Sequence, residues 1–236
     1  MTPPWTPASP GWCLIVPVKA LDRAKTRLSA WLGSALPPAA RQELALAFAV
    51  DTIQAATRCP EVSAVVVVTD DRRVADALAS TAVTVVPDLP AAGLNAALRH
   101  GARIARHSCP AGGIGALSAD LPALRPTDLA AVLRAARGHD SAMVADMDGS
   151  GTTLFLTRSA RDFTPSFGAG SRGRHIAAGA VVLGENAISL RCDVDTMPDL
   201  DSALGLGVGA ATSAQAARLP GRRGVAQPAG CERMLH

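Results

Sequence analysis

Four cationic side chains follow the first apolar run of the chain. The stretch IVPVKALDRAKTRLS breaks its apolar run at Pro17 and then supplies Lys19, Arg23, Lys25 and Arg27. Ammonium and guanidinium groups clustered in this way bind phosphate oxygens. The same spacing is also typical of the solvated face of an amphipathic helix, so both interpretations stay open at this point.

Three aspartates further along the chain provide the opposite charge. Asp120 ends an apolar run in LSADLPAL, and Asp193 and Asp195 lie two residues apart in RCDVDTMPDL, on one side of an extended segment. Carboxylates are the protein ligands of Mg²⁺, which completes its shell with phosphate and water. Asp120 could instead serve a turn or a helix cap, and the pair could be solvated, although like charges so close cost stability unless something offsets them.

Two glycine-containing stretches are candidates for binding an acid. SFGAGSRGRH places two glycines and a serine before a helix-like segment with Arg172 and Arg174, and it contains His175, the only histidine in a candidate site. Glycines allow close backbone approach, and free N–H groups at a helix start bind phosphate or carboxylate. In GSGTTLF, Thr152 or Thr153 could donate to a bound acid. An ordinary flexible loop is the alternative, and neither stretch has P-loop or GxGxxG spacing.

Strand-like and helix-like segments alternate around these motifs. The apolar or β-branched runs are WCLIVPV, SAVVVVTD, AVTVVPD, GGIGALSAD, SAMVAD, TTLFL and AISLRCDVD. Spans such as PPAARQELALAFAVDTIQAA and RPTDLAAVLRAARG have helical spacing and start at proline. This rhythm predicts an α/β protein with a doubly wound, mostly parallel sheet. Ligands of such sheets bind beyond the carboxyl ends of the strands, where the charged motifs fall.

Composition limits the classes of partner. The net charge is +3 over 236 residues, and there is no tyrosine, so neither a global field nor an aromatic platform indicates nucleic acid. Five widely spaced cysteines form no zinc motif and indicate a reduced, cytoplasmic protein. The chain has no secretory signal pattern and no apolar run of membrane-spanning length, which predicts no membrane association.

The chain divides into three parts by composition. Residues 1–11 are proline-rich and are expected to form a disordered leader. Residues 12–204 are expected to form one domain, and residues 205–236 a low-complexity basic tail without sustained apolar periodicity.

Taken together, the motifs resemble those of a known enzyme family. VPVKALDRAKTRL, VVVVTDD, GLNAAL, LSADLPAL, GSGTTLF, FGAGSRGRH and DVDTMPDL occur in this order over residues 13–204. They are similar to the phosphoenolpyruvate and 2-phospho-L-lactate guanylyltransferases, which make the activated precursor of coenzyme F-420. The resemblance implies a nucleotidyltransferase fold of the GT-A type, like that of the sugar-nucleotide transferases. It also implies attack of a phospho-acid on the α-phosphorus of GTP, with release of pyrophosphate.

The resemblance also implies roles for residues that match the motifs. The metal ligands, for Mg²⁺, would be Asp120, Asp193 and Asp195. The phospho-acid would contact Thr153, Gly168 and Ser171. The nucleotide would contact Lys19, Lys25, Arg27 and Asn95, with Lys25 and Arg27 catalytic beside the leaving pyrophosphate and Asn95 near the guanosine. Many GT-A relatives carry a glycine-rich GGxSxRMG signature where this chain has Pro17, Val18 and Lys19, so side chains rather than backbone would hold more of the triphosphate.

The identity of the phospho-acid is a narrower question. Phosphoenolpyruvate is favoured because the basic tail and the Ala/Arg/Gly-rich composition resemble that branch. 2-Phospho-L-lactate and 3-phospho-D-glycerate are alternatives, as is an acceptor such as molybdopterin or a sugar phosphate. A GTP-binding regulatory module without catalysis would have the same fold, and a homodimer is a further expectation.

Overall fold

The computed structural model describes residues 11–23, 25, 28, 30–31, 34–89, 91–108, 112–159 and 161–219. Its main sheet has seven strands in the order β5-β4-β1-β6-β8-β7-β9. Neighbouring strands are parallel except at β8, which runs antiparallel to both β6 and β7. The strands are β1 (Trp12–Pro17), β4 (Val62–Val68), β5 (Thr84–Val86), β6 (Ile114–Leu117), β7 (Ser141–Val144), β8 (Leu154–Thr157) and β9 (Val181–Val182).

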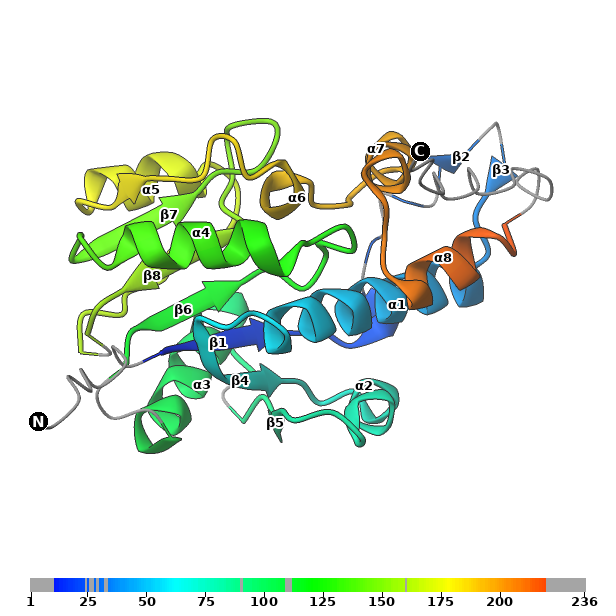
Figure 1. Ribbon diagram of the computed structural model, residues 1–236. Helices are drawn as coiled ribbons and strands as arrows, with labels where there is room; N and C mark the ends of the chain where they lie inside the picture. Colours follow the sequence, from blue (N-terminus) through cyan, green and yellow to red (C-terminus); the bar gives the residue numbers. More distant parts are fainter. Residues whose placement is uncertain are drawn as a thin grey trace, which may run out of the picture.

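Helices cover both faces of this sheet (Figure 1). α1 and α4 pack into one hydrophobic core on one face, and α3 packs into a second core on the other. This arrangement confirms the predicted doubly wound, mostly parallel α/β fold. The helices are α1 (Pro38–Thr57), α2 (Arg72–Leu78), α3 (Leu94–Ser108), α4 (Pro126–Ala136), α5 (Ser171–Ala177), α6 (Ile188–Arg191), α7 (Met197–Leu206) and α8 (Ala210–Ala216). A 3-10 turn, η1 (Leu21–Arg23), and a small ribbon of β2 (Ala30–Trp31) and β3 (Ser34–Ala35) follow β1.

The central strand β1 shows why its sequence is apolar throughout. Trp12, Leu14 and Val16 belong to the core beneath α1 and α4. Cys13 and Ile15 belong to the core beneath α3. Because successive side chains of a strand point to opposite faces, a strand covered on both faces has no position for a polar residue. The continuous apolar run is the sequence signature of this double burial.

The folded chain continues past residue 205, where the sequence predicted a loose tail. α7 runs to Leu206, α8 follows it, and Leu219 is buried in a third core that contains Phe48 of α1. The expected boundary is wrong for residues 205–219, because α8 has the sequence AATSAQA and too few large apolar side chains to show a helical period. Residues 1–10 of the expected leader and 220–236 of the expected tail lie outside the described residues.

A buried carboxylate of α1 anchors α8. Asp51, which is 5% exposed, accepts hydrogen bonds from the backbone N–H groups of Ala211 (3.1 Å, to Oδ1) and Thr212 (2.7 Å, to Oδ2). A β-carbon on Gly209 would lie 2.3 Å from this carboxylate, so only glycine allows the close approach. The negative charge satisfies N–H groups that the first turn of a helix leaves without intrahelical partners.

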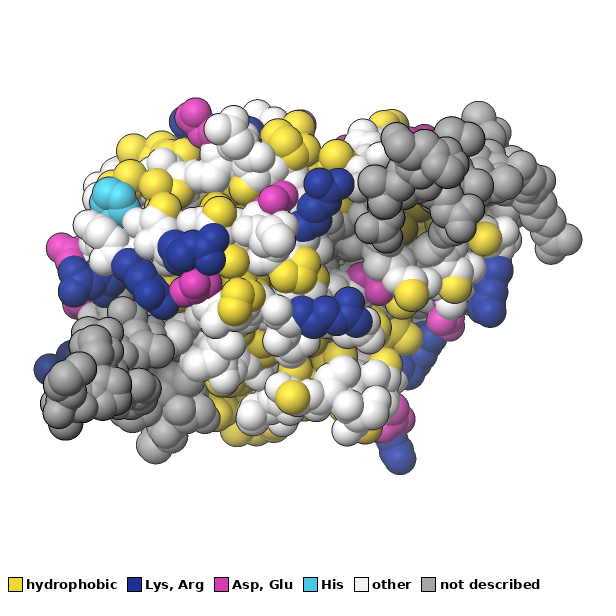
Figure 2. All heavy atoms as spheres, viewed as in Figure 1, with side chains coloured by type: hydrophobic (Ala, Val, Ile, Leu, Met, Phe, Trp, Pro, Cys, Tyr) yellow, Lys and Arg dark blue, Asp and Glu magenta, His cyan; other side chains and the backbone are white. Residues whose placement is uncertain are grey.

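The surface carries its charges in mixed groups. On the face in Figure 2, Lys and Arg side chains lie among acidic and apolar ones rather than in a continuous cationic band. One such group is Glu61, which pairs with Arg134 at 3.2 Å and with Arg137 at 2.6 Å. Among the helices of the described chain, none has the length and apolar character needed to cross a membrane.

We expect Asp51→Ala to lower the free energy of unfolding by about 2 kcal/mol, since two buried N–H groups lose a charged acceptor. Urea denaturation measures this loss, and hydrogen exchange should show it concentrated in α8. Asp76→Ala is the matched control, because that side chain is 71% exposed on α2, and its effect should stay within about 0.5 kcal/mol. Equal losses in the two variants would contradict the anchoring role of Asp51.

Candidate active site

One cavity of about 750 Å³ opens at the carboxyl ends of the central strands. Its wall contains Lys19, which follows β1, and Asp120, which follows β6. The loop after β7, with Thr152, and the start of α5, with Ser171, also line it. The cavity therefore lies where the strand-end rule for open α/β sheets places a ligand.

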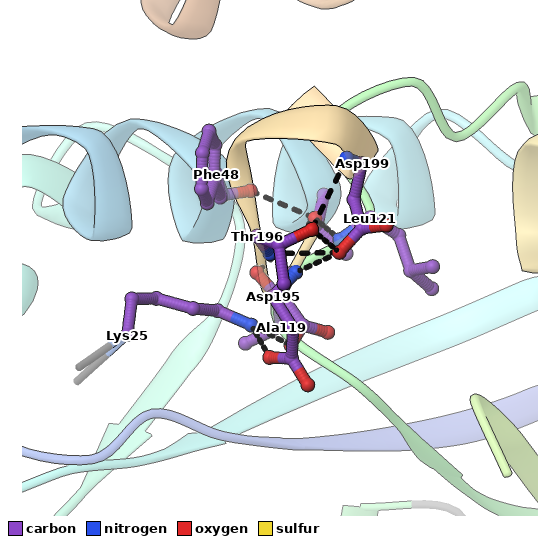
Figure 3. A network of polar contacts seen from close by, with 9 residues as sticks. Lys25, Phe48, Ala119, Leu121, Asp195, Thr196 and Asp199 are labelled. Atoms are coloured by element: carbon purple, nitrogen blue, oxygen red, sulfur yellow. Dashed lines mark hydrogen bonds and ion pairs between the residues drawn. The ribbon is translucent and has the colours of Figure 1, made fainter. Parts of the chain in front are cut away.

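Lys25 connects two of the predicted metal ligands. Its Nζ donates a short hydrogen bond to Asp120 Oδ2 and a 2.7 Å bond to Asp195 Oδ1 (Figure 3). The Lys25 side chain is 12% exposed, so its ammonium group is largely removed from water. Lys25 also has φ 53°, a left-handed backbone conformation that costs energy for a residue with a β-carbon. Such strain is found most often at functional sites.

The charges of this cluster do not balance. Burial lowers the pKa of Lys25, but Asp120 and Asp195 raise it to a net value of about 12, so the ammonium stays charged. Burial raises the pKa of Asp193, and the neighbouring Asp120 and Asp195 raise it further, to about 7, although Lys25 acts in the opposite direction. One ammonium group thus does not neutralise three adjacent carboxylates.

The aspartates fit a divalent cation. Asp120 Oδ1 is buried and has no hydrogen-bond partner, which leaves an anionic oxygen available as a ligand. Asp193 and Asp195 line the same cavity. No three acidic, histidine or cysteine side chains within the described ranges form a ready-made metal site, since Lys25 Nζ lies between Asp120 and Asp195. The donor set is nevertheless all-oxygen and anionic, which suits a hard cation.

Backbone contacts hold the acidic segments together. The N–H of Val194 donates to Asp120 O at 3.0 Å and joins the loop after β6 to the segment before α7. Asp199 Oδ2 accepts from the N–H groups of Asp195 (3.1 Å) and Thr196 (2.7 Å) and from Thr196 Oγ1 (2.7 Å), as Figure 3 shows. This capping box starts α7 and orients the backbone of Asp195.

A buried threonine holds the backbone on both sides of Asp120. Thr52 Oγ1 lies 2.7 Å from Phe48 O and 3.2 Å from Ala119 O, and it accepts the N–H of Leu121 at 3.0 Å. Sequence reasoning missed this residue and Asp199. The pattern TMPD, with threonine three residues before an acidic residue and proline between them, is a local capping signal that could have revealed Asp199, whereas Thr52 sits unmarked inside a helix.

The glycine loop before α5 forms another part of the cavity wall. Gly168 and Gly170 have φ of 119° and 69°, conformations that favour glycine. Arg174 donates from Nη1 to Ala169 O at 2.6 Å, and from Nη2 to Ser166 O at 2.8 Å. Arg174, from α5, therefore helps to hold the loop.

A polar network lies beneath this loop. The N–H of Ser166 donates to His175 Nε2 at 3.0 Å, and His175 Nδ1 lies 3.0 Å from Thr152 Oγ1. Ser171 Oγ is also 3.0 Å from Thr152 Oγ1. His175 is fully buried and stacks on Phe155 with ring centroids 4.4 Å apart. Burial, and secondarily the charge of Arg174, lower the pKa of His175 to about 4, so its ring is neutral near pH 7.

The predicted acid-binding residues lie at or beside the cavity. Gly168 and Ser171 line it, as does Thr152. The side chain of Thr153 is buried, with 1% of the residue exposed. Its backbone N–H donates to Val144 O at 3.0 Å, and its backbone oxygen accepts from the N–H of Ser118 at 2.8 Å. Its hydroxyl has no partner in the described structure. The contact of Thr153 with a phospho-acid stays a prediction.

The predicted nucleotide-binding residues have different surroundings. Lys19 is exposed at the cavity wall, and Lys25 is paired with the carboxylates. Arg27 lies outside the described residues. Asn95 binds the backbone of Phe167 with both ends of its amide, donating to O at 3.1 Å and accepting from N–H at 2.8 Å. This contact gives Asn95 a role in holding the glycine loop, and its predicted contact with guanosine stays a prediction.

A family model and several known proteins match this chain. Residues 12–210 match the family described as guanylyl transferase, CofC-like. A phosphoenolpyruvate guanylyltransferase from Thermomonospora curvata is 52% identical over 210 residues, covering 89% of this chain and 90% of that protein. The protein of the same name from Streptomyces coelicolor is 53% identical over 209 residues, covering 88% of this chain and 97% of that protein.

A solved structure shares the fold at low sequence identity. A protein from Desulfovibrio desulfuricans described as a nucleotide-diphospho-sugar transferase superposes with a TM-score of 0.60 at 17% identity, over 80% of this chain and 84% of that one. This likeness supports the predicted nucleotidyltransferase type of sheet. Because the family model matches residues 12–210 and these two relatives are 52% and 53% identical in sequence, the chain belongs to the CofC-like guanylyl transferase family.

Proposed function

We propose that this protein transfers GMP from GTP to phosphoenolpyruvate and releases pyrophosphate, as a step towards coenzyme F-420. The observation that carries this proposal is the cavity itself, which is lined both by three aspartates and by the glycine loop that would hold an acid. The names of the relatives at about half identity support phosphoenolpyruvate as the acceptor. Because β8 is antiparallel to its neighbour β6, the residues that precede it, including Thr152, lie at the cavity.

The reaction requires the alignment of two anions. A phosphate oxygen of the acceptor attacks the α-phosphorus of GTP, a new P–O bond forms, and the bond to the β-phosphate oxygen breaks to release pyrophosphate. A phosphate dianion is already nucleophilic near neutral pH, so no side chain needs to remove a proton. Transfers of this kind depend on in-line positioning and on neutralisation of charge. The residues of the cavity are of the types that supply both.

The charge of the triphosphate would be met by groups on one wall. Asp120, Asp193 and Asp195 would hold a divalent cation, of which Mg²⁺ is the expected one, and when bound it neutralises phosphate oxygens. Lys25 already reaches this point with its ammonium group, and Lys19 extends from the same segment. Gly168 and Ser171, which line the same cavity, would hold the phospho-acid through N–H and hydroxyl donors.

We expect Asp193→Asn to reduce pyrophosphate release by at least about 100-fold, because one fixed charge of the transition-state environment is lost. The assay contains GTP, phosphoenolpyruvate and Mg²⁺, and thermal denaturation confirms that the variant is folded. Asp162→Asn, at an exposed position outside the cavity, is the control and should retain full activity. Undiminished turnover in Asp193→Asn would contradict the metal assignment.

The acceptor is tested directly with a panel of phospho-acids. Phosphoenolpyruvate, 2-phospho-L-lactate, 3-phospho-D-glycerate and a sugar phosphate are each supplied with GTP, and kcat/KM is compared. We expect the highest value for phosphoenolpyruvate. A higher value for another acid would correct the acceptor, whereas GTP binding without pyrophosphate release from any acceptor would indicate a regulatory module.

Lys25→Met should strengthen binding of Mg²⁺ or Mn²⁺ in the absence of nucleotide by about 10-fold, because a competing cation leaves Asp120 and Asp195. The same variant should lose turnover, since the triphosphate loses a positive charge. Calorimetric titration with each metal measures the first effect. Lys19→Met replaces the other lysine of the chain and should leave metal affinity unchanged. Weaker metal binding in Lys25→Met would show that the ammonium does not compete for these carboxylates.

A further inference from the structure

His175, in the polar network beneath the glycine loop, has no role in the proposed reaction so far. His175 is fully buried and is not among the residues that line the cavity. Its neighbours Thr152 and Ser171 do line the cavity, although they are only 7% and 1% exposed. The imidazole therefore reaches the ligand space only through the two hydroxyl groups.

The backbone selects one tautomer of His175. The N–H of Ser166 can only donate, so Nε2, at 3.0 Å from it, must accept. A neutral imidazole with an accepting Nε2 carries its hydrogen on Nδ1, and this N–H points to Thr152 Oγ1 at 3.0 Å. The pKa of about 4 agrees with a neutral ring, and the stack on Phe155, with ring planes 13° apart, fixes its orientation.

This tautomer determines how many hydroxyl hydrogens remain for a ligand. Thr152 and Ser171 have one hydroxyl hydrogen each, and one of the two lies in the 3.0 Å bond between them. Because Nδ1–H donates to Thr152, neither hydroxyl donates to the imidazole, and the other hydrogen is left over. With the opposite tautomer, Thr152 would donate to Nδ1 and Ser171 to Thr152, so that no hydrogen would remain.

We infer that His175 is a positioning residue that leaves one hydroxyl hydrogen of the Thr152–Ser171 pair to bond an anionic oxygen of the phospho-acid. This role rests on the proposed function. The free hydroxyl hydrogen favours a ligand atom that accepts a hydrogen bond, such as a carboxylate or phosphate oxygen, at this point of the cavity. It also explains why a histidine without contact to the cavity is buried beneath the loop, between Phe155 and Phe167.

Enzyme kinetics separate this role from a purely structural one. His175→Phe preserves an aromatic ring beside Phe155 but removes both hydrogen bonds, so the free hydroxyl hydrogen remains but the N–H that orients the Thr152 hydroxyl is lost. Thr152→Val removes the hydroxyl that links His175 to Ser171. Each should raise the KM for phosphoenolpyruvate about 10-fold, the effect of one hydrogen bond to a charged group, with the KM for GTP within about twofold. The double variant should be no worse than Thr152→Val alone, since the two residues act in series.

Two further variants sharpen the comparison. His175→Asn can still donate to Thr152 from its amide, so its KM for phosphoenolpyruvate should stay near the wild-type value. His139→Phe, after α4 and outside the cavity, is the matched control and should change neither KM. Equal changes in both KM values of His175→Phe, or additive effects in the double variant, would overturn the inference.

The tautomer itself is measured on the wild-type protein. A long-range ¹H–¹⁵N spectrum of protein labelled at histidine should show, near pH 7, one ring that is protonated at Nδ1 and not at Nε2. The signals of this ring should be absent from the His175→Phe spectrum. A proton on Nε2 in an enzyme that releases pyrophosphate from GTP and phosphoenolpyruvate would overturn the role of His175 alone. Absence of that release in the wild-type protein would instead contradict the proposed function, and with it the inference.

Discussion

Repulsion among three carboxylates is the constraint around which this site is organised. Asp120, Asp193 and Asp195 converge at the strand ends, and one buried ammonium group, that of Lys25, offsets part of their charge. Like charges at such close range are unfavourable unless cations accompany them. The fold holds them together through contacts that do not involve the carboxylates themselves, among them the bond from Val194 N–H to Asp120 O and the capping of α7 by Asp199. This enforced proximity would give the cavity the affinity for a divalent cation that the proposed reaction requires.

The topology of the sheet explains how hydroxyl groups reach the cavity. The parallel strands β1 and β6 end at the cavity with Lys19 and Asp120. β8 runs the other way, so its start rather than its end lies there, and Thr152 and Thr153 precede it. A purely parallel sheet would place only strand ends at this edge. The antiparallel strand β8 thus brings the hydroxyl group of Thr152 to the cavity that the acidic residues also line.

Much of the fold and of the acidic site could be predicted from the sequence because the signals are local. The uninterrupted apolar run of β1 reports burial on both faces, and Asp120 stands where the parallel strand β6 ends. Asp193 and Asp195 instead follow helix α6, within the run AISLRCDVD that was expected to be a strand. The contacts that hold the site residues in place could not be predicted, because they join residues that are far apart in the sequence. Lys25 meets a carboxylate 170 residues away, and Asn95 meets a backbone 72 residues away. Helix α8 escaped prediction because a buried carboxylate of another helix, rather than its own apolar side chains, holds it in place.

The anchoring of the glycine loop has a consequence for the thermodynamics of binding. Asn95, Arg174 and His175 already satisfy the backbone groups of residues 166, 167 and 169. A loop that is already ordered without a ligand would lose little conformational entropy on binding an acid. The glycines therefore supply close approach without the usual disadvantage of a flexible chain. Preorganisation of this kind leaves discrimination among phospho-acids to the few side chains that touch them.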